Sequence, residues 1–366
     1  MTNIKILAVS FLFFAILPKA YSQSLTDSTQ IDAPKVISFA LDGNIPKALE
    51  LINSQPDERM IKRHVKAKKG FNDRFYYEDD RSDYLQKRHS DIDGLLAVYM
   101  DYWRKSFHDY PKVHDSLLRK NLSSYLNKNY APAKKLKASD REQKFDKYLK
   151  GYIKSKGLFT TGFGQTGRFY DLLVWKKETD TTYTFMLSGQ KIHTPVVFME
   201  DFITLGWEEY ATLDRAYPGG WATPHSLYCV KQSYDTNSEK FLVSYLAHEG
   251  RHFEDYKLFP KLETANLEYR AKLTELGLLD KTLFDILQFF ITNADPKTED
   301  GHKKADYYAI SHLSQALFDK DFEADISQWK ALPIAKIHQA SAALLEKNTA
   351  LLKGLGKNVV TSLPKS

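Results

Sequence analysis

Two histidines four residues apart stand in the segment Ser244–Tyr256, which reads SYLAHEGRHFEDY. On an α-helix, residues at i and i+4 lie one above the other on the same face, so His248 and His252 can bind one metal ion. Neutral imidazole is a common zinc ligand. Glu249 follows His248 directly and is rotated from it by about 100°, because a helix has about 3.6 residues per turn. We therefore expect its carboxylate beside the ion, where it can act as the general base on a zinc-activated water.

A catalytic zinc site takes three protein ligands and leaves one position open. Glu263 and Glu268 are the nearest downstream candidates for the third ligand. Pro260 should end the motif helix, and the pattern of KLETANLEYRAKLTEL predicts a second helix that runs back beside it. Reflection about residue 260 puts Glu268 level with His252 and leaves Glu263 about 7 to 8 Å short, at about 1.5 Å per residue. We expect Glu268 as the third ligand, and the alternative for it is a surface pair with Lys272.

The motif HEGRH, followed by a glutamate on the next helix, resembles the gluzincin group of HExxH zinc metallopeptidases, to which thermolysin belongs. The resemblance covers about residues 237–277. It implies that His248, His252 and Glu268 bind Zn²⁺, that Glu249 is the general base, and that the chain hydrolyses peptide bonds.

Two features differ from the thermolysin-type pattern. The interval between the second histidine and Glu268 is shorter, and Lys272 stands where that family has an aspartate four residues after its glutamate ligand. The hydrogen-bond partner of a zinc-bound histidine must then come from elsewhere, and Asp255 is one candidate. Glu275 lies on a face similar to that of Glu268, two turns further along the chain.

A zinc peptidase also needs a hydrogen-bond donor for the oxyanion that develops at the attacked carbonyl. His225 and Tyr228 precede the motif helix on a predicted strand, and Tyr307, Tyr308 and His312 follow on a later helix. Any of the five could contact the transition state or the substrate, and ordinary packing or surface exposure is the alternative for each. The stretch WATPHSLYCV is the candidate edge strand for holding a substrate backbone.

The pattern of apolar residues changes along the chain. A spacing of three and four from about residue 34 to 156 predicts an all-α region. Short runs rich in aromatic and β-branched residues follow from Gly157, among them RFYDLLVWKKE, TTYTFML, residues 191–198 and residues 222–230. A capping box at Thr236–Glu239 predicts the start of the motif helix. The expected fold is α+β: an all-α N-terminal domain at 23–156, then a zincin-like metallopeptidase domain at 157–366 with a small antiparallel or mixed sheet and an active-site helix.

Residues 1–22 have the pattern of a signal peptide. Lys5 precedes an apolar run at 6–18, and Ala20-Tyr21-Ser22 offers small residues where signal peptidase reads them. We expect cleavage near Ser22/Gln23 and export to the periplasm or out of the cell. The apolar run is too short for a permanent anchor, and no later segment has the roughly 18 consecutive apolar residues of a transmembrane helix.

Composition limits the remaining classes of function. The formal charge of +6 falls to +4 without Lys5 and Lys19, and so mild an excess indicates no nucleic-acid partner. The single cysteine, Cys229, excludes an internal disulfide, but 366 residues with 43% apolar content can bury a sizeable core. The sequence therefore predicts an exported zinc metallopeptidase acting on peptides or proteins. The alternative is a non-catalytic secreted binding or structural protein that keeps a zincin-like fold.

Overall fold

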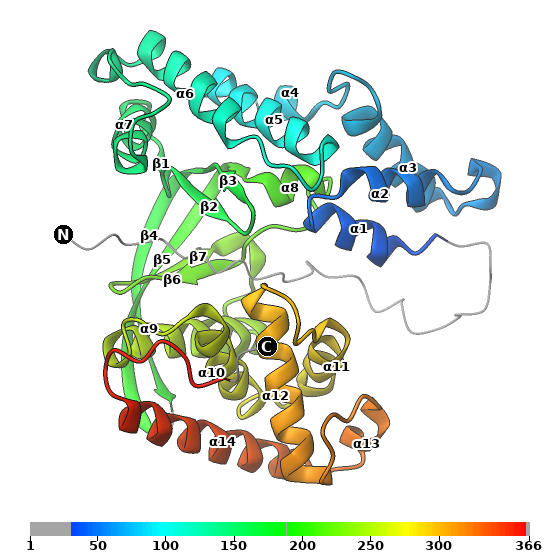
Figure 1. Cartoon of the computed structure of the whole chain (residues 1–366), viewed down its shortest axis with the longest axis vertical. Helices are drawn as coiled ribbons and strands as arrows, with labels where there is room; N and C mark the ends of the chain where they lie inside the picture. The colour runs from blue at the N-terminus through cyan, green and yellow to red at the C-terminus, as the bar shows by residue number, and fades with distance from the viewer. Residues whose placement is uncertain (1–30, 89, 188, 364–366) are drawn as a thin grey trace. The chain divides into compact units, whose positions relative to one another are not determined.

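The computed structural model describes residues 31–88, 90–187 and 189–363, and in these residues the chain is α+β, with a helical N-terminal region (Figure 1). The predicted fold class is confirmed at this level. The predicted signal peptide and its cleavage site lie outside the described residues. No helix in the described part of the chain is long and apolar enough to cross a membrane.

Helices make up the N-terminal region because their apolar faces share one core. Asp32 and Asn44 begin the first two helices by accepting the backbone N–H groups of Lys35 and Lys47 at 3.0 and 3.3 Å. The buried ring of Trp103 lies in the core that these helices enclose. In chain order the elements are α1 (Ala33–Leu41), α2 (Ile45–Asn53), η1 (Asp57–Arg59), α3 (Lys62–Phe71), η2 (Asn72–Tyr76), α4 (Tyr84–Arg88), α5 (Asp93–His108), α6 (Asp115–Asn129), η3 (Ala131–Ala133) and α7 (Glu142–Ser155).

Strands follow from residue 159, as the change in apolar pattern predicts. A five-stranded sheet has the order β1-β4-β5-β7-β6, and β2 pairs with β3 in a separate two-stranded sheet. Two of the predicted strands, RFYDLLVWKKE and TTYTFML, largely merge into β4, which runs unbroken for 15 residues. The strands are β1 (Phe159–Thr160), β2 (Gly164–Thr166), β3 (Phe169–Asp171), β4 (Leu173–Leu187), β5 (Gln190–Leu205), β6 (Gly220–Ala222) and β7 (Leu227–Val230).

The predicted strand at 222–230 is interrupted by a turn, since it contains the last residue of β6, the turn itself and the whole of β7, which pairs antiparallel with β6. Trp221 of β6 pairs with Tyr228 of β7, and between the strands the Thr223 hydroxyl donates to the Ser226 carbonyl at 2.8 Å and accepts its N–H at 3.0 Å. Proline at position 224 cannot donate to a ladder, so the chain turns here.

The motif helix starts differently from its prediction. Its first part, η5 (Lys240–Ala247), is π-helical and continues into α9 (His248–Leu258), which ends before Pro260 as predicted. Ser238 rather than Thr236 caps the start, since its hydroxyl accepts the N–H of Phe241 at 3.1 Å. The capping-box prediction is wrong because Glu239 does not turn back to its own helix. Its carboxylate accepts the backbone N–H groups of residues 280, 281 and 282, at 2.7, 3.1 and 2.8 Å, just before the start of α11.

The predicted second helix is present as α10 (Thr264–Leu276), which packs against α9, α12 and α14 (Figure 1). Its apolar side chains join a core with Leu313 and Trp329, both completely buried. The remaining elements are α8 (Trp207–Ala211), η4 (Lys231–Ser233), α11 (Leu283–Asn293), α12 (Gly301–Phe318), α13 (Ile326–Lys330) and α14 (Ile334–Leu355).

Contacts divide the chain into two compact units. Among the described residues, the first unit contains those up to 178 together with 199–219, and the second contains those at 179–198 together with those from 220 onward. Helices α9, α10 and α12 all belong to the second unit. Because β4 and β5 each contribute to both units, this division does not test the domain boundary predicted at residues 156 and 157.

Candidate metal centre

The structure brings the three predicted metal ligands together. The Nε2 atoms of His248 and His252 are 3.1 Å apart, and the Glu268 carboxylate lies 3.2 Å from His252 Nε2 through Oε1 and 3.4 Å from His248 Nε2 through Oε2. In a tetrahedral zinc site with ligands about 2.0 to 2.1 Å from the metal, neighbouring donor atoms are about 3.3 Å apart. The spacing is close to this, with a different Glu268 oxygen facing each imidazole, so the three side chains could hold one metal ion. Within the described ranges they form a group able to hold a metal, and all three are fully buried.

A buried ion pair fixes the register of α9 against α10. Arg270 of α10 donates to both carboxylate oxygens of Asp255 on α9, at 2.7 and 2.9 Å, and both side chains are completely buried. Arg270 also donates to Asn348 on α14 at 2.8 Å. Asp255 lies three residues after His252, and Arg270 lies two residues after Glu268, so this pair holds the ligand-bearing turns side by side.

The second nitrogen of His248 contacts Glu275 rather than the suggested partner, Asp255. His248 Nδ1 lies 2.9 Å from Glu275 Oε2, which leaves Nε2 for the ligand group. Burial lowers the pKa of His248, but Glu275 and Glu268 outweigh this effect and raise it to about 9. For His252, burial is the largest influence and lowers the pKa. Its Nδ1 has no hydrogen-bond partner among the residues that the structure describes.

Glu249 is fully buried beside the ligand group. Neither of its carboxylate oxygens has a hydrogen-bond partner of ordinary geometry in the described part of the chain, although the Ala222 N–H is close enough to favour the charged form. Burial raises the pKa of Glu249 to about 8, against the attraction of His248. An unpaired buried carboxyl group is costly, and a metal site beside it is one arrangement that compensates for the cost.

The alternative roles of the two candidate glutamates can be compared directly. Glu268 does not form a surface pair with Lys272, because both are buried and Lys272 lies 2.7 Å from Asp306. Glu263 is exposed at the N-terminus of α10, where its carboxylate accepts the side-chain N–H of Asn266 at 3.2 Å. The geometry therefore favours Glu268 over Glu263 as the third ligand.

Sequence reasoning missed His302, on the first turn of α12. Its Nδ1 lies 3.1 Å from Glu268 Oε2. The two residues are 34 positions apart, and no local pattern links them. Glu268 and Lys272 are four residues apart, as are His302 and Asp306. This equal spacing of opposite charges is the only signal in the sequence that could have suggested that the two helix faces meet.

The five candidate substrate contacts lie in varied surroundings. His225 is exposed in the β6–β7 turn, and the Tyr228 ring stacks on Trp221 with centroids 5.5 Å apart. On α12, the rings of Tyr307 and Tyr308 contact one another, and His312 Nδ1 lies 2.8 Å from the Tyr269 hydroxyl. These contacts are ordinary packing, and a role in substrate binding stays a prediction for each of the five residues.

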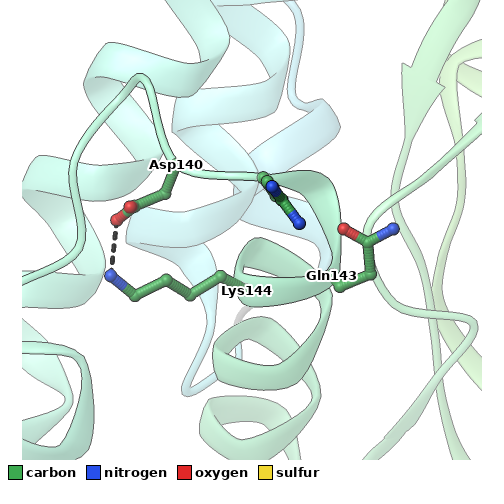
Figure 2. A pocket seen from close by; sticks show the side chains of 4 residues that line it. Asp140, Gln143 and Lys144 are labelled. Carbon is green, nitrogen blue, oxygen red and sulfur yellow. Dashed lines mark hydrogen bonds and ion pairs between the residues drawn. The ribbon is translucent and has the colours of Figure 1, made fainter.

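A surface pocket in the first unit lies at the start of α7 (Figure 2). Asp140, Arg141, Gln143 and Lys144 line it. Lys144 lies 2.7 Å from the Asp140 carboxylate, which also accepts the backbone N–H of Lys137 at 2.8 Å. These contacts satisfy the only carboxylate in the pocket, and its side chains are exposed or half-buried, so we assign no chemistry to it.

Comparisons with family models, with curated proteins and with solved structures each find no match for this chain. What the metal centre can do is therefore inferred from the distances, burial and charges of its own side chains.

Proposed function

We propose that this protein is a zinc-dependent metallopeptidase of the gluzincin type, with a zincin-like fold in the second unit. The observation that supports it best is the buried group formed by His248, His252 and Glu268, which could hold one metal ion, with the Glu249 carboxyl group beside it. Two imidazole nitrogens and one carboxylate favour zinc over magnesium or calcium, which prefer ligand sets made of oxygen.

The roles of the side chains follow from their positions. Zinc, when bound, lowers the pKa of a coordinated water and polarises the carbonyl of a peptide bond. Glu249 is the proton acceptor, because it is adjacent to the ligands and no hydrogen bond engages its carboxylate elsewhere among the described residues. The same group then donates the proton to the leaving amine.

The strand order supports a peptide as the substrate. Strand β6 stands at one end of the five-stranded order, so an extended peptide could pair with it once its three buried residues become accessible. Its last residue, Ala222, is also the residue whose backbone N–H is close to Glu249. A substrate backbone along β6 would therefore pass near the proton acceptor.

Export is part of the proposal and rests on the pattern at residues 1–22. Mass spectrometry of the protein recovered outside the cytoplasm should find an N-terminus at or near Gln23. An intact Met1 form confined to the cytoplasm would contradict it.

Complete burial of the site favours a second candidate function. His248, Glu249, His252 and Glu268 are all solvent-inaccessible, whereas a catalytic zinc keeps one position open to substrate. A metal held in this way could stabilise a non-catalytic secreted binding or structural protein. Catalysis requires that the site open.

One experiment separates the two functions. Metal analysis of the purified protein should find about one zinc per chain in either case. Glu249→Gln preserves shape and keeps the three ligands, so zinc should stay while hydrolysis of a mixed peptide library falls by about 10² to 10⁴. Glu254→Gln, on the same helix but paired with Lys257, is the matched control and should retain activity. Wild-type protein that binds zinc and cleaves no peptide would favour the binding or structural protein.

A further inference from the structure

Two polar contacts join α10 to α12 next to the metal centre. His302 Nδ1 lies 3.1 Å from Glu268 Oε2, and Lys272 Nζ lies 2.7 Å from Asp306 Oδ1. On α10, Glu268 and Lys272 are four positions apart and share a face. The same holds for His302 and Asp306 on α12. Since both contacts advance by four residues on both helices, α10 and α12 run in the same direction along this face.

The first contact acts on a metal ligand. Glu268 Oε2, which faces His302, is also 3.4 Å from His248 Nε2, while Oε1 is 3.2 Å from His252 Nε2. The His302 ring attracts Oε2 electrostatically at this distance, without a hydrogen bond of ordinary geometry, and so restrains rotation of the carboxylate about its last bond. His302 is not in the group of described residues whose donor atoms could share one metal ion. It therefore contacts the ligand from outside that group.

The second contact and a helix cap hold His302 in place. Lys272 and Asp306 are both buried, and Asn293 donates to the other Asp306 oxygen at 2.8 Å. At the start of α12, Asp300 accepts the backbone N–H of His302 at 2.8 Å. The backbone that carries His302 is thus fixed on both sides of the side chain, by the cap before it and by the buried ion pair one turn later.

We propose that His302 is a positioning residue that orients the Glu268 carboxylate toward His248 and His252. The inference rests on the metal site of the proposed function, but not on peptide hydrolysis. Removal of a group that orients a metal ligand typically lowers metal affinity by about 10- to 100-fold.

Two variants of similar size test the polar contact between His302 and Glu268. His302→Asn can keep an N–H near the position of Nδ1, whereas His302→Leu puts a methyl group there. Zinc affinity of the full mature chain, measured by competition with a chromophoric chelator, should fall by about 10- to 100-fold in the Leu variant and stay close to wild type in the Asn variant. His338→Leu is the matched control and should leave zinc affinity unchanged. His338 is 26% exposed against 24% for His302, and its Nε2 contacts the Leu279 carbonyl at 2.8 Å, away from the ligands.

Urea unfolding of each variant after chelation identifies a purely structural effect. Such an effect would lower the free energy of unfolding without changing the zinc affinity of the folded chain, and it would overturn the inference. An Asn variant as weak as the Leu variant would also overturn it. If the Leu variant does not fold, His302→Ala gives the same comparison at this partly exposed position. Wild type that binds no zinc would reject the metal site itself, whereas wild-type affinity in a folded Leu or Ala variant would reject only the role of His302.

Discussion

Glu275 Oε2 lies 2.9 Å from Nδ1 of His248, the ring nitrogen on the side away from the ligand group. This carboxylate accepts a hydrogen bond from Nδ1–H and so directs Nε2 toward His252 and Glu268. Glu268 and Glu275 are two turns apart on α10, so one helix supplies both a ligand and the group that orients another ligand.

Loss of this contact should weaken zinc binding without removing a ligand. Glu275→Leu deletes the acceptor at a buried position, and we expect zinc affinity to fall by about 10- to 100-fold. Glu275→Gln retains an acceptor oxygen and should lose less. Chelator competition measures both variants, and equal affinities for Glu275→Leu and wild type would exclude an orienting role for Glu275.

The two candidate third ligands should respond oppositely to the same change. Glu268→Gln replaces a charged ligand oxygen inside the buried group, and zinc affinity should fall strongly, because a neutral amide is a weak zinc ligand. Glu263→Gln changes an exposed residue at the start of α10 and should leave affinity at the wild-type level. Isothermal titration with zinc compares the variants, and the reverse order would reject Glu268 as the third ligand.

The buried pair between Asp255 and Arg270 should contribute strongly to stability. Asp255→Asn leaves the guanidinium of Arg270 buried without its counter-charge, which typically costs about 3 to 5 kcal/mol. The half-exposed pair between Glu254 and Lys257 is the control, and Glu254→Gln should cost less than about 1 kcal/mol. Urea unfolding measures both. Similar losses in the two variants would show that the buried pair does not lock α9 onto α10.

Asp171 should make stability depend on pH. Its Oδ1 accepts the backbone N–H groups of Leu172 and Trp207 at 2.9 and 2.8 Å, yet burial raises its pKa to about 7. A raised pKa means that the folded chain holds this proton more tightly than the unfolded chain. The stabilising contribution is therefore complete below about pH 4 and is lost as the pH rises through about 7.

The variant Asp171→Asn carries no titrating group and isolates this effect. Its free energy of unfolding relative to wild type should rise between pH 4.5 and 8, by an amount on the order of 4 kcal/mol at most, since one pKa unit corresponds to about 1.36 kcal/mol. Urea unfolding at several pH values gives the difference, in which the titration of other groups cancels. A difference that stays constant over this range would show that Asp171 titrates with an ordinary pKa.

The sequence by itself determined the parts of the candidate site that depend on local geometry. The period of a helix places His248 and His252 on one face with Glu249 beside them, and proline 260 ends that helix, in any tertiary context that keeps it helical. The position of Glu268 beside His252 could be predicted as well. The connection between the two helices is short, so they have little choice of register. The α+β class followed from the change in apolar spacing near residue 157.

Only the tertiary structure decided which side chains support these residues. Glu239 matched a local capping pattern, but the backbone N–H groups at 280–282 compete for its carboxylate, and no local rule ranks them. Glu275 rather than Asp255 meets His248, because Asp255 is already paired with Arg270. His302 reaches Glu268 across 34 residues of chain. Hydrogen bonds and ion pairs go to whichever partner packing brings within about 3 Å, and that choice depends on how whole helices dock.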